Sequence, residues 1–143
     1  MKGLSLFSCT GIGEYMIQNV DIVVANELLP ERCKIYRHFY PECNMIEGSI
    51  VDHVEYIIES AIEAGVEFMI ATPPCQSFSN AGKKEINDLR TPLFLFVIEV
   101  IKRLRPKYVV IENVPGFMKS RYNSESDETI EQRFASELND YII

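Results

Sequence analysis

LFLFVIEVIKRLRPKYVVI, residues 93–111, joins a helix pattern directly to a strand pattern and sets the fold class. Apolar side chains recur every three or four residues in its first part, at Leu93, Val97, Val100, Ile101 and Leu104. Pro92 suits the first turn of that helix, and Pro106 follows its end. Tyr108-Val109-Val110-Ile111 then has the β-branched and aromatic composition of a strand. The stretch therefore predicts a helix that leads through a short turn into a buried strand.

The same alternation runs through the rest of the chain. A second apolar stripe with helical spacing occupies residues 54–62. Short apolar runs predict further strands at residues 4–7, 21–25, 45–46 and 68–71. Strands that alternate with helices form a mostly parallel sheet with helices on both faces. We therefore predict an α/β, Rossmann-like fold, with residues 1–143 lying in one domain.

The composition is that of an ordinary soluble globular protein, but its charge is acidic. Hydrophobic residues make up 47% of the chain and charged residues 24%, with a net charge of −7. No segment has the apolar length of a membrane span or a signal peptide, which predicts a cytoplasmic location. A protein that holds duplex DNA unaided usually presents a basic surface. If the substrate is a nucleic acid, we expect another segment or chain to supply most of the positive charge.

The four cysteines, Cys9, Cys33, Cys43 and Cys75, include no Cys-x-x-Cys pair. This spacing argues against a structural zinc site, and a reducing compartment argues against disulfides, so no metal is expected. Cys9, Cys33 and Cys43 are interpreted as small buried hydrophobic residues. Cys75 differs because two prolines precede it at the end of a predicted strand. A thiol placed there beside polar groups can act as a thiolate nucleophile.

Small and polar residues follow every predicted strand, at the edge where parallel sheets bind ligands. These segments are residues 8–13, 26–27, 48–49, 72–76 and 112–115. Gly11-x-Gly13 is compatible with a nucleotide-binding loop or with an ordinary turn. Glu27 is compatible with a ribose-hydroxyl acceptor or with a solvated charge. Glu112 follows a strand predicted to be buried, where a carboxylate needs partners or a raised pKa.

Several of these segments together resemble the motifs of cytosine-C5 DNA methyltransferases. The segments are Phe7-Ser8-Cys9-Thr10-Gly11, Pro74-Cys75-Gln76 with Ser77-Phe78-Ser79, Asp88-x-Arg90-x-x-Leu93-Phe94, and Glu112-Asn113-Val114, in the order and approximate separation of the family. The likeness runs from about Leu4 to the C-terminal residues. It implies an S-adenosylmethionine-dependent methyltransferase fold and transfer of a methyl group to C5 of a cytosine flipped out of duplex DNA.

The resemblance also implies roles for individual residues. Cys75 would be the nucleophile that adds to cytosine C6, and Glu112 would hold a ring nitrogen and the amino group of the base. Asn113 would support the nucleophile loop, to which Gln76 also belongs. The residues implied around S-adenosylmethionine are Phe7, Gly11, Pro74 and Leu93, with Glu27 accepting hydrogen bonds from the ribose hydroxyls.

The chain departs from the family pattern near the implied cofactor. Cys9 stands where the family usually has glycine, so either the turn tolerates a side chain or the backbone stays further from the cofactor. Ser49 stands where an aspartate usually contacts the adenine amino group, and Leu28 replaces a frequent aromatic residue. A hydroxyl still accepts a hydrogen bond but carries no charge, so we expect weaker cofactor binding.

The family continues beyond Glu112-Asn113-Val114 to an arginine-bearing motif, a target recognition region and a helix that completes the cofactor site. Arg133 lies too early and in the wrong context to be that arginine. Tyr141-Ile142-Ile143 resembles the start of a sixth strand that is cut short, which would leave an open sheet edge. We expect this chain to be the N-terminal part of a catalytic domain that is inactive alone. It would either pair with a second polypeptide or be a truncated form.

Other functions remain open at this level. One branch of the family methylates tRNA, and no residue here distinguishes a 2′-hydroxyl. A non-catalytic S-adenosylmethionine-binding module would explain the departures at Cys9 and Ser49 but not the intact Pro-Cys-Gln and Glu-Asn-Val segments. A nicotinamide-dependent enzyme would explain Gly11 and Glu27 but would leave Cys75 and Glu112 without a role.

Overall fold

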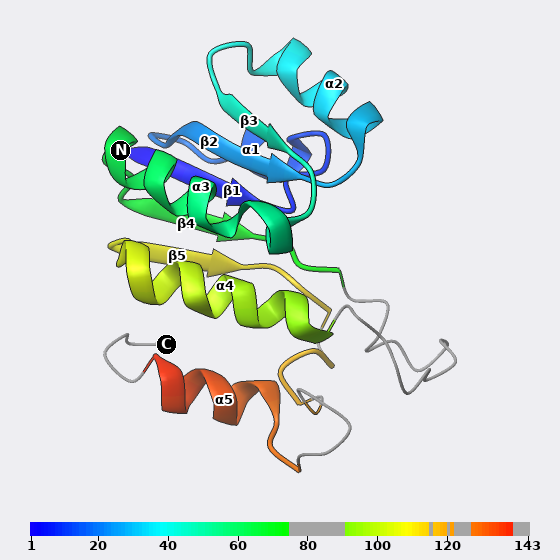
Figure 1. The fold of residues 1–143 in the computed structure, drawn as a ribbon, viewed down its shortest axis with the longest axis vertical. Coiled ribbons are helices and arrows are strands. Elements are labelled where there is room, and N and C mark those ends of the chain that lie inside the picture. The colour runs from blue at the N-terminus through cyan, green and yellow to red at the C-terminus, as the bar shows by residue number, and fades with distance from the viewer. Residues whose placement is uncertain (75–90, 115, 120, 122–126, 139–143) are drawn as a thin grey trace.

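A parallel sheet forms the centre of the molecule in the computed structural model, which describes residues 1–74, 91–114, 116–119, 121 and 127–138. The strands lie in the order β3-β2-β1-β4-β5, and every neighbouring pair is parallel. Their bounds are β1 Lys2–Leu6, β2 Asp21–Glu27, β3 Asn44–Glu47, β4 Phe68–Ala71 and β5 Tyr108–Ile111. All five arrowheads point the same way (Figure 1). The prediction of an α/β fold with a parallel sheet is confirmed.

The helices include both of those predicted from apolar stripes. They are α1 Ile12–Tyr15, α2 Pro30–Phe39, α3 Ile50–Ala64, α4 Thr91–Leu104 and α5 Ile130–Glu137. The Ser49 hydroxyl caps α3 by accepting a 3.2 Å hydrogen bond from the Val51 amide. Gly65 ends the same helix with φ +71°, a conformation that suits glycine because a β-carbon is disfavoured there.

Helices pack on both faces of the sheet, as predicted. Alternate residues of β4 point to opposite faces, so Met69 and Ala71 join the core beneath α3 and α4, while Phe68 and Ile70 join a smaller core. That smaller core includes Cys33 and Tyr36 of α2, both fully buried. The α2 side is important for the site because it lies against the loop that follows β1.

Strand β5 forms one edge of the described sheet. Its Tyr108 and Val110 side chains are 58% and 44% exposed, whereas Val109 and Ile111 pack against the larger core. A mainly apolar cavity of about 810 Å³ runs along this strand, and residues that line it include Tyr108, Val110, Val114, Phe117 and Phe134. The prediction that β5 is buried is therefore wrong for one of its faces, because no described element covers that face.

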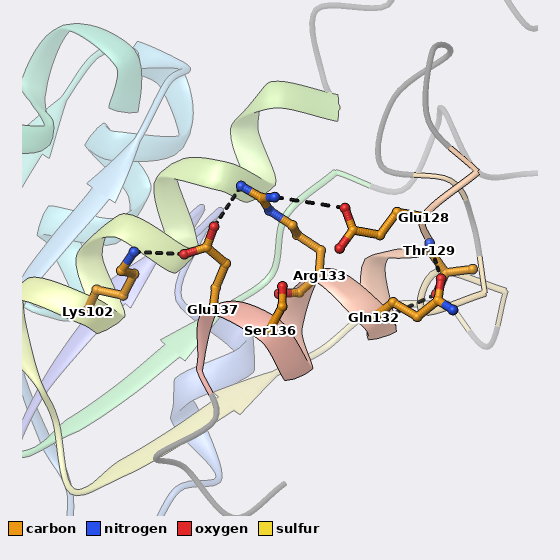
Figure 2. A network of polar contacts seen from close by, with 7 residues as sticks. All are labelled: Lys102, Glu128, Thr129, Gln132, Arg133, Ser136 and Glu137. Carbon is orange, nitrogen blue, oxygen red and sulfur yellow. Dashed lines mark hydrogen bonds and ion pairs between the residues drawn. The ribbon is translucent and has the colours of Figure 1, made fainter.

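Helix α5, which the sequence patterns did not predict, packs beside α4. Phe94 of α4 contacts Phe134 and Phe117, with ring centroids 4.6 and 5.4 Å apart. Glu137 links the two helices through Lys102 at 2.7 Å and also pairs with Arg133 at 2.6 Å (Figure 2). Arg133 thus takes part in a structural ion-pair network, which agrees with its exclusion as the missing family arginine.

No helix in the described part of the chain has the length and apolar character needed to cross a membrane.

Candidate active site and cofactor site

The carboxyl ends of the strands lie along one edge of the sheet (Figure 1). Backbone hydrogen bonds connect segments that follow neighbouring strands. The Ser8 amide donates to Asn26 O at 3.0 Å, joining the segment after β1 to the end of β2. The Glu112 amide donates to Ala71 O at 3.0 Å, joining the segment after β5 to the end of β4. The structure therefore brings the described parts of the segments predicted to form a site onto one rim, which is the usual ligand position in such sheets.

The loop after β1 has an unusual backbone. Phe7, Cys9 and Gly11 all have positive φ values, of 57°, 53° and 84°. A left-handed conformation costs a residue with a β-carbon roughly 1–2 kcal/mol, so two of these three positions are strained. The turn does tolerate a side chain at position 9, but the interpretation of Cys9 as a buried residue is wrong. Its side chain is exposed because the loop lies at the rim rather than in the core.

Glu27 is the buried carboxylate of this rim, only 4% exposed. Its Oε2 accepts a 2.9 Å hydrogen bond from the Cys9 amide, and its Oε1 accepts a 2.9 Å bond from the Leu29 amide. The Arg32 guanidinium lies 3.9 Å from Oε1. Each carboxylate oxygen has two lone pairs, so each retains capacity to accept one further donor. Leu28, next in the chain, is 59% exposed and gives this part of the rim an apolar surface.

Asn26 organises the neighbouring part of the rim, and sequence reasoning gave it no role. It is 2% exposed, and its side-chain amide donates to Ile46 O at 2.9 Å and to Gly48 O at 3.0 Å. A polar residue directly after the apolar run at residues 22–25 was the available signal, because a buried amide must find partners. Ser49 follows Gly48, and its hydroxyl is engaged in the cap of α3.

The ends of β4 and β5 are joined by Asn113. Its Nδ2 donates a 2.8 Å hydrogen bond to Pro73 O, and its Oδ1 accepts a 2.9 Å bond from the Val114 amide. Glu112 is exposed, so the expectation of a buried carboxylate is wrong; β5 is the edge of the described sheet. Cys75 and Gln76 lie outside the described residues, and Pro74, half-buried, is the last described residue before them.

Two other predicted cofactor residues, Phe7 and Leu93, are half-buried and pack against the larger core. Leu93 lies in the first turn of α4. Among the residues that the structure describes, no cluster of three or more His, Cys, Asp or Glu side chains could hold a metal ion.

Glu14, which the sequence did not single out, is a buried acid beneath this loop. It is 6% exposed, and the Ser5 hydroxyl donates a hydrogen bond to its Oε1. Burial raises the pKa of the Glu14 carboxyl, and this effect outweighs the lowering by the Ser5 hydrogen bond. Burial therefore makes this carboxyl easier to protonate than an exposed glutamate.

Comparison with known proteins identifies the family. The sequence profile of the C-5 cytosine-specific DNA methylase family matches residues 1–140. The chain belongs to this family. The predicted resemblance is therefore confirmed, and the fold is that of the family's solved members.

The relatives of this chain include proteins named as Type II methyltransferases and proteins named as tRNA methyltransferases. The Type II methyltransferase M1.HgaI of Avibacterium volantium is 44% identical over 128 residues, covering 83% of this chain and 36% of the relative. The tRNA (cytosine(38)-C(5))-methyltransferase of Mus musculus is 29% identical over 124 residues, covering 84% and 28%. A crystal structure of a Spodoptera frugiperda DNMT2 variant superposes with a TM-score of 0.67 at 28% identity, covering 96% of this chain and 40% of that one. The chain thus spans about a third of the length of these relatives.

Proposed function

We propose that this chain is the cofactor-binding and nucleophile-bearing part of a DNA cytosine-C5 methyltransferase. The observation that carries the proposal is the pairing of two family segments on adjacent strands. Pro74-Cys75-Gln76 follows β4 and Glu112-Asn113-Val114 follows β5, and the Asn113 side chain bonds to Pro73 at 2.8 Å. The described residues that precede the proposed nucleophile and those that carry the proposed base-holding carboxylate therefore leave the sheet on adjacent strands.

The residues around the ends of β1, β2 and β3 fit S-adenosylmethionine. Glu27 presents two oxygens, and each accepts one amide hydrogen bond and keeps a second lone pair for a ribose hydroxyl. The exposed Leu28 offers an apolar surface beside it for an adenine ring. Ser49 lies at the end of β3, where its hydroxyl can accept a second hydrogen bond in addition to the Val51 amide. S-adenosylmethionine, when bound, would supply an electrophilic methyl group to the reaction.

The proposed chemistry at the base uses the chain's own side chains. The Cys75 thiolate forms a bond to C6 of the flipped cytosine, which raises the electron density at C5. The Glu112 carboxyl, by holding a proton at the ring nitrogen, offsets the charge that develops there. Transfer of the methyl group to C5 would leave S-adenosylhomocysteine as the product. Loss of the C5 proton to water and cleavage of the sulfur–C6 bond then restore the ring and the thiolate. If Cys75→Ser retained full methyl transfer, this covalent route would be wrong.

We also propose that a further segment or a second polypeptide completes the enzyme. The chain spans about a third of the relatives it matches. Its net charge of −7 gives it little attraction for DNA phosphates, so the parts that grip the substrate are expected elsewhere. The exposed apolar side chains Tyr108 and Val110 provide a surface on which such a partner could pack.

The substrate proposed is duplex DNA, with tRNA as the second candidate. tRNA remains the second candidate because the Mus musculus relative is named as a tRNA methyltransferase. DNA is preferred because the higher identity is to a relative named as a Type II methyltransferase. Transfer of labelled methyl groups to duplex DNA and to tRNA, measured in parallel with the completed enzyme, decides between them. Label in tRNA alone would overturn the DNA assignment.

The first experiment is a calorimetric titration of the chain with S-adenosylmethionine. We expect saturable binding near one equivalent, and a dissociation constant at least tenfold higher for Glu27→Gln. The matched control is Glu47→Gln, since Glu47 ends the adjacent strand but is exposed and paired with Arg37 at 2.8 Å. The control should bind as the unchanged chain does. Equal weakening by both substitutions, or no weakening by Glu27→Gln, would remove Glu27 from the proposed site.

A further inference from the structure

The loop at residues 7–11 has three left-handed residues, and each is bonded by a side chain distant in sequence. The Thr72 hydroxyl donates to Phe7 O at 2.9 Å, across 65 residues. The Glu27 carboxylate accepts from the Cys9 amide at 2.9 Å, across 18 residues. The Tyr40 hydroxyl donates to Gly11 O at 2.8 Å, across 29 residues. A conformation that costs free energy at positions 7 and 9 persists only where surrounding groups fix it.

Tyr40 is well placed to fix the last of these residues. It follows α2, where its amide bonds to Tyr36 O at 2.8 Å, and its ring packs on the fully buried Tyr36 ring with centroids 4.6 Å apart. A β-carbon on Gly11 would lie 2.3 Å from Tyr40 Cε2, so the ring covers the side of Gly11 where a side chain would project. Burial raises the pKa of Tyr40, so its hydroxyl keeps the proton that it donates.

Thr72 fixes the first left-handed residue from the opposite direction. It lies immediately after β4, and its own amide donates to Leu6 O at 3.2 Å while its hydroxyl bonds to Phe7 O. The same strand end leads on to Pro73, whose carbonyl accepts from Asn113. Thr72 therefore connects the loop after β1 to the segment that carries Cys75.

We propose that Tyr40 and Thr72 are positioning residues that hold the 7–11 loop in the shape that binds S-adenosylmethionine. This inference rests on the proposed function, because the loop's ligand is that of the proposed enzyme. Neither side chain is required to touch the ligand. They act by fixing backbone groups on either side of the Cys9 amide, which is itself bonded to Glu27.

The test compares Tyr40→Phe and Thr72→Val with the unchanged chain by calorimetric titration with S-adenosylmethionine. One lost hydrogen bond of about 1 kcal/mol corresponds to about a fivefold weaker dissociation constant, which we expect for each variant. Tyr56→Phe is the matched control, because Tyr56 is 54% exposed on α3, on the opposite face of the sheet. Thr72→Ser keeps the hydroxyl and should restore most of the affinity. Unchanged dissociation constants for Tyr40→Phe and Thr72→Val would overturn the inference while leaving the proposed function intact.

Amide hydrogen exchange of residues 7–13, measured without any ligand, separates this inference from the proposed function. We expect exchange to be several-fold faster in Tyr40→Phe and Thr72→Val, with α3 unchanged, whereas a general loss of stability would accelerate both regions. If the unchanged chain does not bind S-adenosylmethionine, cofactor binding by this chain alone fails, and exchange alone decides whether the loop is held as described. Exchange equal to that of the unchanged chain would then overturn the positioning role too.

Discussion

Asn113, after β5, donates its side-chain amide to the Pro73 carbonyl, after β4, at 2.8 Å. This bond crosses between the two segments that carry the family motifs, and it lies two residues before Cys75 in the chain. The same side chain accepts from the Val114 amide at 2.9 Å, so both ends of the Asn113 amide are used. A carboxylate or an apolar group at this position could not make both bonds.

Asn113→Asp is expected to lower the free energy of unfolding by about 1 kcal/mol, measured by urea denaturation. Aspartate keeps the acceptor for Val114 but replaces the donor to Pro73 with a second acceptor. In the completed enzyme, turnover should fall by about ten- to a hundredfold, because the segment before Cys75 loses its attachment. The dissociation constant of S-adenosylmethionine should hardly change, since β1 and β4 lie between β5 and the Glu27 strand. Asn44→Asp, at an exposed position, is the control and should alter neither quantity.

Cys9→Gly is expected to stabilise the chain by about 0.5–1 kcal/mol. Cys9 has φ +53°, where glycine is not strained, and part of the gain is offset by the greater freedom of glycine in the unfolded chain. Cys9→Ala is the matched control, because it removes the thiol but keeps the β-carbon, and it should give no gain. Equal stabilities of the two variants in urea denaturation would show that the backbone at position 9 is not strained.

Glu14→Gln is expected to stabilise the chain increasingly as the pH rises. The pKa of Glu14 is raised above its ordinary value of 4.5, so its contribution to stability is full below that value and is lost as the pH rises through the folded-state pKa. Glutamine is neutral throughout and can still bond to the Ser5 hydroxyl. The difference in unfolding free energy between variant and unchanged chain should therefore be larger at pH 8 than at pH 5.

Glu63→Gln is the control for that comparison, because Glu63 is exposed on α3. Its unfolding free energy should follow that of the unchanged chain at both pH values. A constant offset between Glu14→Gln and the unchanged chain would mean that Glu14 takes up no extra proton on folding.

The sheet and its two main helices could be predicted because their apolar residues follow simple periods. Residues 54–62 and 93–104 show the stripe that α3 and α4 bury, and each of the five strands contains one of the short apolar runs. Helix α2 escaped prediction because it buries only Cys33 and Tyr36, while its other large apolar side chains, Ile35 and Phe39, are exposed. The open face of β5 was also missed, since burial of a strand depends on which other elements cover it.

The sequence indicates which residue types lie at the candidate site, but it does not indicate the hydrogen bonds between them. Glu27 was found because an acid at a strand end is a recognisable pattern. Its amide bonds to Cys9 and Leu29 depend on the path of the loop in space. The bond from Tyr40 to Gly11 spans 29 residues, and no local pattern indicates it. Cys9 was misjudged because cysteines are usually buried, whereas the left-handed turn at the rim leaves this one exposed.

Val110→Thr and Val109→Thr should differ in their effect on stability, although the two valines are neighbours in β5. Val110 is 44% exposed on the uncovered face, so threonine, with its similar shape and good strand propensity, should change the unfolding free energy by less than about 0.5 kcal/mol. Val109 packs against the larger core, where a hydroxyl without a partner should cost about 1–3 kcal/mol. Urea denaturation at two protein concentrations measures both free energies of unfolding.

A cost for Val110→Thr that equals the cost for Val109→Thr and grows with protein concentration would show that this face is covered by a second copy of the chain in solution. Equal costs that do not depend on concentration would place Val110 in the core and contradict the open edge. A small cost for Val110→Thr combined with loss of activity in the completed enzyme would identify this face as the surface where the remainder of the enzyme packs.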